Sequence, residues 1–191
     1  MANQDAAFGL RAIGKVGQNR DNQGLSEYSI ASGTTSAIYQ NDPVQALATG
    51  YIGVQDTTTG VILGSLNGVF YTDPTTSKPT FGNYWPGDIN ATDAVAFVSD
   101  DPYERFEIQS NNAGASAQTD IGNCADIEYT AGATPNYVSK VELDDSSLGT
   151  SDGQLKIVGL SKDPDNNDLT SANVNWVVTI NEHFLKATAG I

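Results

Sequence analysis

Short apolar runs separated by turn-forming residues make up most of this 191-residue chain. Gly, Thr, Asn and Asp recur between the runs, at a spacing that is typical of an all-β protein. Residues 174–181 alternate between bulky apolar and mostly polar side chains, and this period of two predicts a half-buried strand. Other strands are expected at Tyr28-Ile30, Ala37-Tyr39, Tyr51-Gln55, Val61-Leu63, Val69-Tyr71, Val95-Val98, Phe106-Gln109, Asp126-Tyr129, Val138-Leu143 and Leu155-Val158. Many short strands joined by frequent turns predict a sandwich or a barrel, jelly-roll-like in outline.

Three segments interrupt this regular pattern. Asn67-Gly68 stands between two apolar runs and predicts a hairpin turn. Residues 42–50 begin with Asp-Pro and end with Gly, which also suits a short helix, but the β character of the flanks favours a strand. Residues 72–93 are rich in Pro and Asp, so we expect a long irregular surface loop there, held down by Phe81, Tyr84 and Trp85.

The first 25 residues differ from the rest in charge and in pattern. They carry Arg11, Lys15 and Arg20 against Asp5 and Asp21, in a chain whose formal net charge is −14. Their larger apolar residues follow no sustained period, so the segment by itself buries too little surface to offset the entropy of ordering it. We therefore expect residues 1–25 to form an extended arm held by another chain, followed by a single β domain over 26–191. An arm folded back on its own domain is the alternative.

Composition and charge exclude several classes of partner. A sequence pI near 4.1 argues against nucleic acid and against an anionic membrane surface, because both require a basic face. No apolar run approaches the roughly 20 residues of a membrane-spanning helix. Cys124 is the sole cysteine, so an internal disulfide is impossible. We expect synthesis in a cytoplasm.

Candidate catalytic groups are few. His183 is the only histidine, and no G-x-S-x-G nucleophile motif accompanies it. Four carboxylates lie within eight residues, a density that could supply an acid/base pair, although 23 acidic residues make such neighbours common by chance. These carboxylates are Asp100, Asp101, Glu104 and Glu107. The sequence favours a solvated acidic edge, and we expect no enzyme and no cofactor.

Residues 163–168 resemble the start of a calcium loop, with suitable ligand types at positions one, three and five. The sixth position, which such loops fill with Gly, is Asp168, and the twelfth, which they fill with Glu, is Val174. A plain β-turn explains Pro164 followed by Asp and Asn equally well. We therefore expect no metal.

An ordered series of short motifs runs along nearly the whole chain. It comprises AAFGLRAIGKVG at 6–17, FYTDPTT at 70–76, NYWP at 83–86, VAFVSDDP at 95–102, FEIQ at 106–109, TDIGN at 119–123, VELD at 141–144, LKIVGL at 155–160 and INEH at 180–183. In this order the motifs resemble a family of tailed-bacteriophage virion structural proteins that are taken to be capsid decoration, or cement, proteins. The resemblance implies a structural protein on the outer surface of the phage head, without an active site.

The resemblance also implies partners. A cement protein bridges neighbouring major capsid subunits, and relatives commonly form trimers, so we expect the major capsid protein and a homotrimer. In that scheme Phe8 and Leu10 anchor the arm in the capsid while Arg11, Lys15 and Arg20 meet acidic groups. The loop residues Phe81, Tyr84 and Trp85 are candidates for the subunit contact, although Trp85 would equally fill the core of its own domain.

Three other functions remain open from the sequence. The chain could be a tail component or a major capsid protein, although it has no long helix or basic face of the kind that a major capsid protein carries. It could be a carbohydrate-binding module that uses Tyr84, Trp85 and Tyr103 as stacking platforms. Third comes an enzyme built on the carboxylates of residues 100–107.

Overall fold

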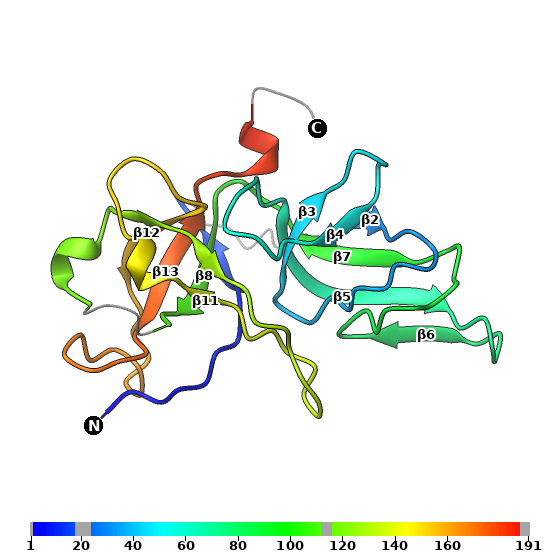
Figure 1. Ribbon diagram of the computed structural model, residues 1–191, viewed down its shortest axis with the longest axis horizontal. Helices are drawn as coiled ribbons and strands as arrows, with labels where there is room; N and C mark the ends of the chain where they lie inside the picture. Colours follow the sequence, from blue (N-terminus) through cyan, green and yellow to red (C-terminus); the bar gives the residue numbers. More distant parts are fainter. Residues whose placement is uncertain (1, 18–23, 112–115, 188–191) are drawn as a thin grey trace.

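The computed structural model describes residues 2–17, 24–111 and 116–187, and these are built almost entirely of β-strands (Figure 1). One antiparallel sheet has the strand order β1-β8-β13-β12-β9. Its strands are β1 (Arg11–Lys15), β8 (Glu104–Gln109), β13 (Asn175–Ile180), β12 (Leu155–Leu160) and β9 (Cys124–Ala125). The second sheet has the order β2-β7-β5-β3-β4, with β6 also paired to β5. Its strands are β2 (Ser26–Ser29), β7 (Val95–Ser99), β5 (Gly64–Thr72), β3 (Pro43–Ala46), β4 (Ile52–Val54) and β6 (Pro79–Gly82).

The remaining elements are short. A two-stranded ladder joins β10 (Ile127–Glu128) to β11 (Glu142–Leu143). The described residues also contain three single-turn 3-10 helices: η1 (Gln118–Asp120), η2 (Asp145–Ser147) and η3 (Phe184–Lys186). The all-β prediction is confirmed, and the packed antiparallel sheets are consistent with the predicted sandwich.

The strand with the clearest alternating pattern occupies the centre of its sheet. In β13, Trp176, Val178 and Ile180 are buried, and the strand pairs with β8 on one side and β12 on the other. Each apolar residue therefore packs beside the apolar residues of two neighbouring strands, as in the pair of Trp176 with Ile108. The period of two is thus explained by burial of one face.

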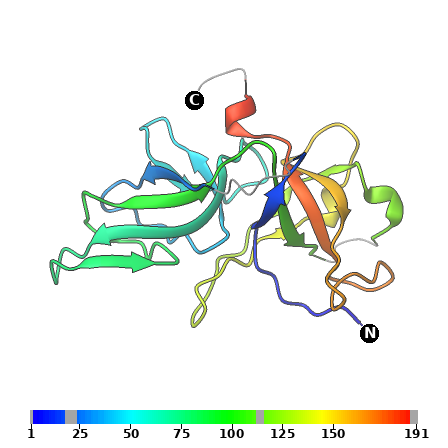
Figure 2. The same ribbon diagram turned by 180° about the vertical axis from the view of Figure 1, so that it is seen from behind.

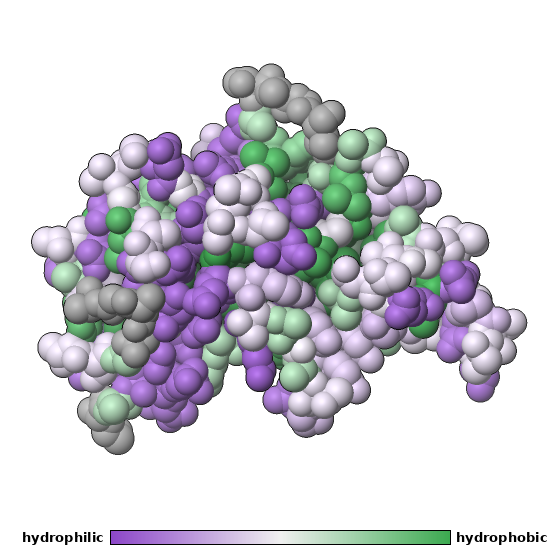
Figure 3. Space-filling model, viewed as in Figure 1, coloured by the Kyte–Doolittle hydropathy of each residue, from purple (hydrophilic) through white to green (hydrophobic). Residues whose placement is uncertain are grey.

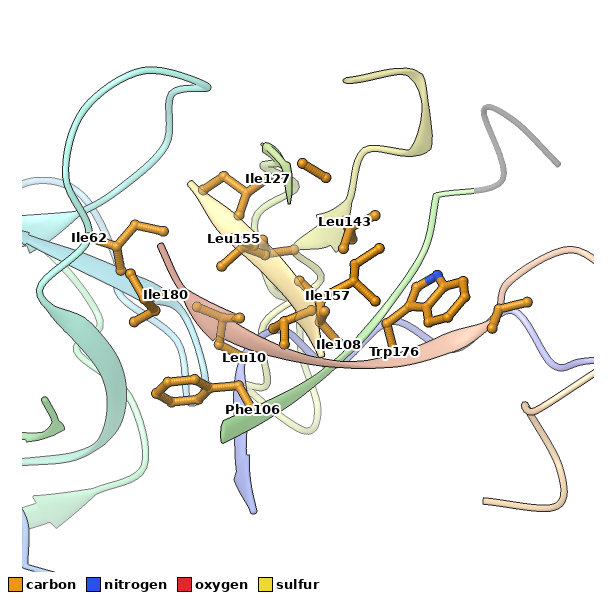
Figure 4. Packing of buried hydrophobic residues seen from close by; sticks show 14 residues of the cluster. Leu10, Ile62, Phe106, Ile108, Ile127, Leu143, Leu155, Ile157, Trp176 and Ile180 are labelled. Carbon is orange, nitrogen blue, oxygen red and sulfur yellow. The ribbon is translucent and has the colours of Figure 1, made fainter. Parts of the chain in front are cut away.

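Each sheet has its own cluster of buried apolar side chains. In the first sheet, Phe106, Ile157 and Trp176 lie in a cluster that also contains Leu10 from the N-terminal segment (Figure 4). In the second sheet, Leu66, Val69 and Trp85 belong to a separate cluster. Ile62 precedes β5 of the second sheet but packs in the first cluster, near Ile180 (Figure 4). The predicted single domain therefore contains two apolar clusters, joined where Ile62 crosses between them.

The Asn67-Gly68 turn prediction is wrong, because both residues lie inside β5. Leu66 pairs with Val98, and Gly68 pairs with the adjacent residue Phe97. β5 therefore has one extra residue, Asn67, between two consecutive pairs. This is the geometry of a β-bulge. The Asn-Gly signal marked a local irregularity, but the long pairing with β7 keeps the chain in one strand.

The prediction of an irregular loop over 72–93 is also wrong in part. Pro79–Gly82 forms β6 and pairs with the C-terminal half of β5. The Phe81 ring packs against that of its partner Phe70 in a tilted arrangement, with the ring centroids 4.7 Å apart. Pro is compatible with β6 because Pro79 is the first residue of a strand paired on one side only. For residues 42–50, the strand interpretation is confirmed by β3.

The N-terminal segment does not extend away from the molecule. It runs alongside the five-stranded sheet and enters that sheet as β1, paired with β8 at the boundary between the two sheets (Figures 1 and 2). Leu10 is completely buried. The expectation of an arm without regular structure of its own is therefore corrected. Its ordering comes from surfaces far downstream in the same chain, which local composition does not reveal.

Candidate functional site

The segment Phe8–Leu10 fastens the two sheets to each other. The Leu10 side chain packs in the cluster of the first sheet, near Phe106 (Figure 4), while its backbone binds residues of the second. Its N–H donates to the Asn41 carbonyl at 2.9 Å, and its carbonyl accepts from the Ser65 hydroxyl at 2.6 Å. Asn41 in turn donates from Nδ2 to the Phe8 carbonyl at 3.1 Å. Leu10 is thus a structural link and offers no apolar surface to a capsid.

The basic residues of β1 are also engaged within the chain. Arg11 forms an ion pair with the buried Glu107 and lies 4.4 Å over the Phe8 ring. Lys15 Nζ lies 2.6 Å from an Asp101 carboxylate oxygen, and this hydrogen bond raises the pKa of Lys15. Arg11 and Lys15, which were predicted with Phe8 and Leu10 as capsid contacts of an extended arm, thus contact acidic residues of their own chain in this structure. Arg20 lies outside the described residues.

The four neighbouring carboxylates hold the edge strands β1 and β2. Asp100 accepts hydrogen bonds from the Ser26 and Tyr28 hydroxyls, and Glu104 accepts one from the Gly14 N–H at 3.1 Å. With Asp101 and Glu107 paired to β1, three of the four hold that strand and the fourth holds β2. This arrangement accounts for the acidic run without an acid/base pair.

His183 is buried where the two sheets meet. Its backbone bridges to Ile62, and its Nδ1 accepts from the Leu185 N–H at 3.1 Å, which caps η3. Burial and the nearby Lys186 ammonium lower the pKa of His183 to about 4, so the ring is neutral at pH 7. A neutral imidazole used as a helix cap is a structural group.

The calcium-like segment forms turns closed by its own side chains. Asp163 accepts from the Asp165 N–H, and Asp168 accepts from the Thr170 N–H and hydroxyl. Within the described residues, no group of three or more His, Cys, Asp or Glu side chains could hold a metal ion. The β-turn interpretation therefore describes this segment better.

The three aromatic residues of the 72–93 segment have different environments. Trp85 is completely buried in the second cluster, with its ring edge against Tyr71 at 5.4 Å. Tyr84 stacks on Tyr137 at 4.1 Å. Phe81, in contrast, is 74% exposed. Trp85 is thus a core residue, and Phe81 alone of these three presents most of its side chain to the surface.

An exposed apolar surface lies beside β1, on residues for which the sequence predicted no such role. We use the name β1-edge patch for the exposed apolar residues of β1 and the segments around it, which are Ile13, Val16, Leu25, Tyr103 and Leu185. The Val16 N–H donates to the Tyr103 carbonyl, and Lys186, next to Leu185, lies 5.2 Å over the Tyr103 ring. Leu25 lines a groove of about 220 Å³ together with Ala12 of β1.

The signal for this patch in the sequence was weak. Ile13 and Val16 stood out only as apolar residues without a period, and Tyr103 as a possible sugar platform. The pairing of β1 with β8 brings Val16 to the Tyr103 backbone, and η3 places Lys186 over the Tyr103 ring. Only this tertiary arrangement makes a surface of them.

In Figure 3 hydrophilic residues gather along the lower part of the five-stranded half, while apolar surface is concentrated near η3 and the junction of the sheets.

Burial, reinforced by Asp5, Glu128 and Asp145, raises the pKa of Glu142 to about 7. Crowded carboxylates of this kind are expected in a chain with a net charge of −14.

Asp42 is a buried carboxylate at the contact between the arm and β3. It is completely buried, and one of its oxygens accepts from the Tyr39 N–H at 2.8 Å. Burial raises the pKa of Asp42 to about 6 from its ordinary 3.8, although hydrogen bonds from Ser139 and Tyr39 act in the opposite direction. The folded state therefore holds this proton more tightly than the unfolded state does.

We expect the Asp42→Asn variant to lose part of the pH dependence of unfolding. The Asp42 contribution to stability is complete below pH 3.8 and disappears as the pH rises through about 6, with a size of roughly 3 kcal/mol at most. Urea unfolding of wild type and variant between pH 3.5 and about 7.5 measures the difference. Asp93→Asn is the control, because hydrogen bonds from Thr72 lower the pKa of Asp93. Its contribution is lost only below pH 3.8, so this variant should keep the wild-type slope over most of the range. Equal slopes for wild type and Asp42→Asn would contradict the assignment.

No helix in the described ranges is long and apolar enough to cross a membrane. Comparison with known proteins found no matching family model, no matching curated protein and no matching solved structure.

Proposed function

We propose that this protein is a decoration protein of a tailed-phage head, which binds the outer capsid surface and bridges neighbouring major capsid subunits. The ordered series of motifs described above supports the family, and the β1-edge patch is the observation that carries the contact. Five large apolar side chains on β1 and on the segments around it are exposed there, in a chain with a net charge of −14. Apolar and aromatic side chains at the centre of a contact with a polar rim are typical of protein–protein interfaces.

We propose this patch, in place of the arm residues Phe8, Leu10, Arg11, Lys15 and Arg20, as the capsid contact. Leu10 and the charges of Arg11 and Lys15 are engaged internally, so steering by free basic groups has little support. Ile13 and Val16 come from the same segment and stay exposed. The contact we propose is therefore mainly apolar, and its affinity should depend weakly on salt.

The triple variant Ile13→Ser, Val16→Ser and Tyr103→Ser should fold and lose attachment to capsids. We expect its affinity for head particles that lack decoration to fall by about 100-fold or more, because it removes three exposed side chains of the proposed interface core. Co-sedimentation of purified protein with such particles measures the loss. Val158→Ser is the matched control, since Val158 is an exposed apolar residue on β12. Unchanged attachment of the triple variant would exclude the patch.

Location on the virion needs a separate experiment. Particles from a phage with the gene deleted should lack density on the head surface and keep their tails. Loss of tails would instead support a tail component. A carbohydrate-binding module has less support, because Trp85 is buried and the Tyr103 ring faces Lys186.

We also propose a homotrimer, on the basis of the family resemblance alone. Trp85 does not offer a contact, so Phe81 on the β5–β6 hairpin and the half-buried Tyr84 are the remaining aromatic candidates of that segment for self-association. The mass of the free protein at micromolar concentration tests the trimer in solution.

A further inference from the structure

Residues 3–6 are held as an extended peptide would be, through their backbone. Gln109, which is almost completely buried, accepts from the Ala6 N–H at 2.8 Å and donates to the Gln4 carbonyl at 2.9 Å. Asn166, also buried, donates to the same carbonyl at 2.7 Å and accepts from the Gln4 N–H at 3.4 Å. Asn3 makes a reciprocal pair with the backbone of Asp168. Amide side chains here replace the hydrogen bonds of a neighbouring strand.

The same mode of binding continues to residue 10. Asn41 donates to the Phe8 carbonyl, and Ser65 donates to the Leu10 carbonyl. We call Gln109, Asn166, Asn41 and Ser65 the arm track. Every one of these side-chain contacts is to a backbone atom of the arm, and every receptor lies far downstream in the sequence.

Two positions make the track selective. The Leu10 side chain fills a completely buried site in the first cluster. A Cβ atom at Gly9 would lie 2.4 Å from the Asn41 carbonyl oxygen, so a side chain is excluded there. A segment that fits must therefore carry Gly-Leu at this point and be extended before it. A second copy of this chain supplies both.

We propose that the arm track binds the arm of a second copy, so that residues 2–17 are exchanged between neighbouring molecules. Each exchanged arm recovers the same hydrogen bonds, ion pairs and Leu10 site that it has within one chain, and only the entropy of association opposes the exchange. A tethered arm has an effective concentration in the millimolar range, so isolated molecules keep their own arm. When many copies are crowded on a common surface, the arms of neighbouring molecules reach a similar local concentration. A molecule then no longer favours its own arm over a neighbour's. The exchange goes beyond the proposed capsid attachment and does not depend on it.

Cysteine pairs across β1 and β8 detect an exchanged arm in the full-length protein. Arg11 and Glu107 are Cα partners in this ladder, a spacing at which a disulfide can close. An isotope-labelled Arg11→Cys chain and an unlabelled Glu107→Cys chain are unfolded together, refolded at about 1 mM and oxidised. We expect a covalent dimer linked between positions 11 and 107, identified by mass spectrometry, at least about tenfold above the same mixture refolded at about 1 μM.

Two controls define the outcome. A mixture of Arg11→Cys with Val158→Cys places the second thiol on β12 and should yield only background dimer. The double variant Arg11→Cys/Glu107→Cys should close within one chain at low concentration, which shows that the pair has the right geometry. A second pair, Lys15→Cys with Glu104→Cys, occupies another register position of the same ladder and is run in parallel in case the first pair does not fold. If the double variants close but the mixtures give no 11–107 or 15–104 linkage at 1 mM, arms are not exchanged and the proposal is overturned.

Discussion

The Gly9→Ala variant is expected to be less stable than wild type by roughly 2–5 kcal/mol. Gly9 has φ +73°, a left-handed conformation that costs other residues about 1–2 kcal/mol. The added methyl group would also lie 2.4 Å from the Asn41 carbonyl oxygen and 2.5 Å from Ser139 Oγ. Relief of that overlap requires the arm, or the turn at Asn41 that precedes β3, to move, at a further cost of about 1–3 kcal/mol. Chemical unfolding followed by tryptophan fluorescence measures the loss.

Gly17 separates the two causes. It has φ +72°, almost the same as Gly9, but a Cβ atom there would meet nothing within 4 Å. Gly17→Ala should therefore show the conformational cost alone, about 1–2 kcal/mol. Similar losses for the two variants would mean that the close approach of Gly9 to Asn41 does not exist in solution, and the arm would not be packed as described.

The Trp85→Ala variant is expected to destabilise the single chain by about 3–5 kcal/mol, the range for large aromatic residues in a core. Trp85 is completely buried, contacts the Tyr71 ring edge and donates from Nε1 to the Thr34 carbonyl at 3.4 Å. Its backbone pairs with Ile38 in both directions. The loss should be independent of protein concentration, because the side chain packs within one molecule.

Phe81→Ala is the matched control for Trp85. Phe81 lies four residues earlier in the sequence and is 74% exposed. One face of its ring packs against Phe70. Its replacement should change the stability of the single chain by less than about 0.5–1 kcal/mol. A Trp85→Ala variant that unfolds like wild type but fails to self-associate would contradict burial within the chain and return Trp85 to the interface.

Together these variants test what the N-terminal segment is. The residues from Asn3 to Lys15 are bound to groups of the same chain along the first sheet and at its junction with the second. Removal of the arm therefore takes away an edge strand and a core residue, and a truncated chain is expected to be less stable. Loss of capsid binding after such a truncation would not by itself identify a contact, which is why single surface residues are the better test.

The sequence by itself determined the all-β class and the positions of the principal strands. Residues 174–180, 155–158 and 106–109 carry enough local alternation or β-propensity to be recognised without their neighbours. It also determined the strongly acidic surface, because the net charge does not depend on the fold. The ordered motifs gave the only direction toward a function.

The tertiary structure decided everything that depends on distant pairing. Asn67-Gly68 became a bulge because β7 pairs along its whole length, and Pro79–Gly82 became a strand because Phe81 meets Phe70. The basic arm is part of its own domain because it binds residues that lie up to 165 positions away in the sequence, such as Asp168. Hydrogen bonds and burial between such distant residues leave no periodic trace in a single sequence, so neither the arm track nor the β1-edge patch could be read from it.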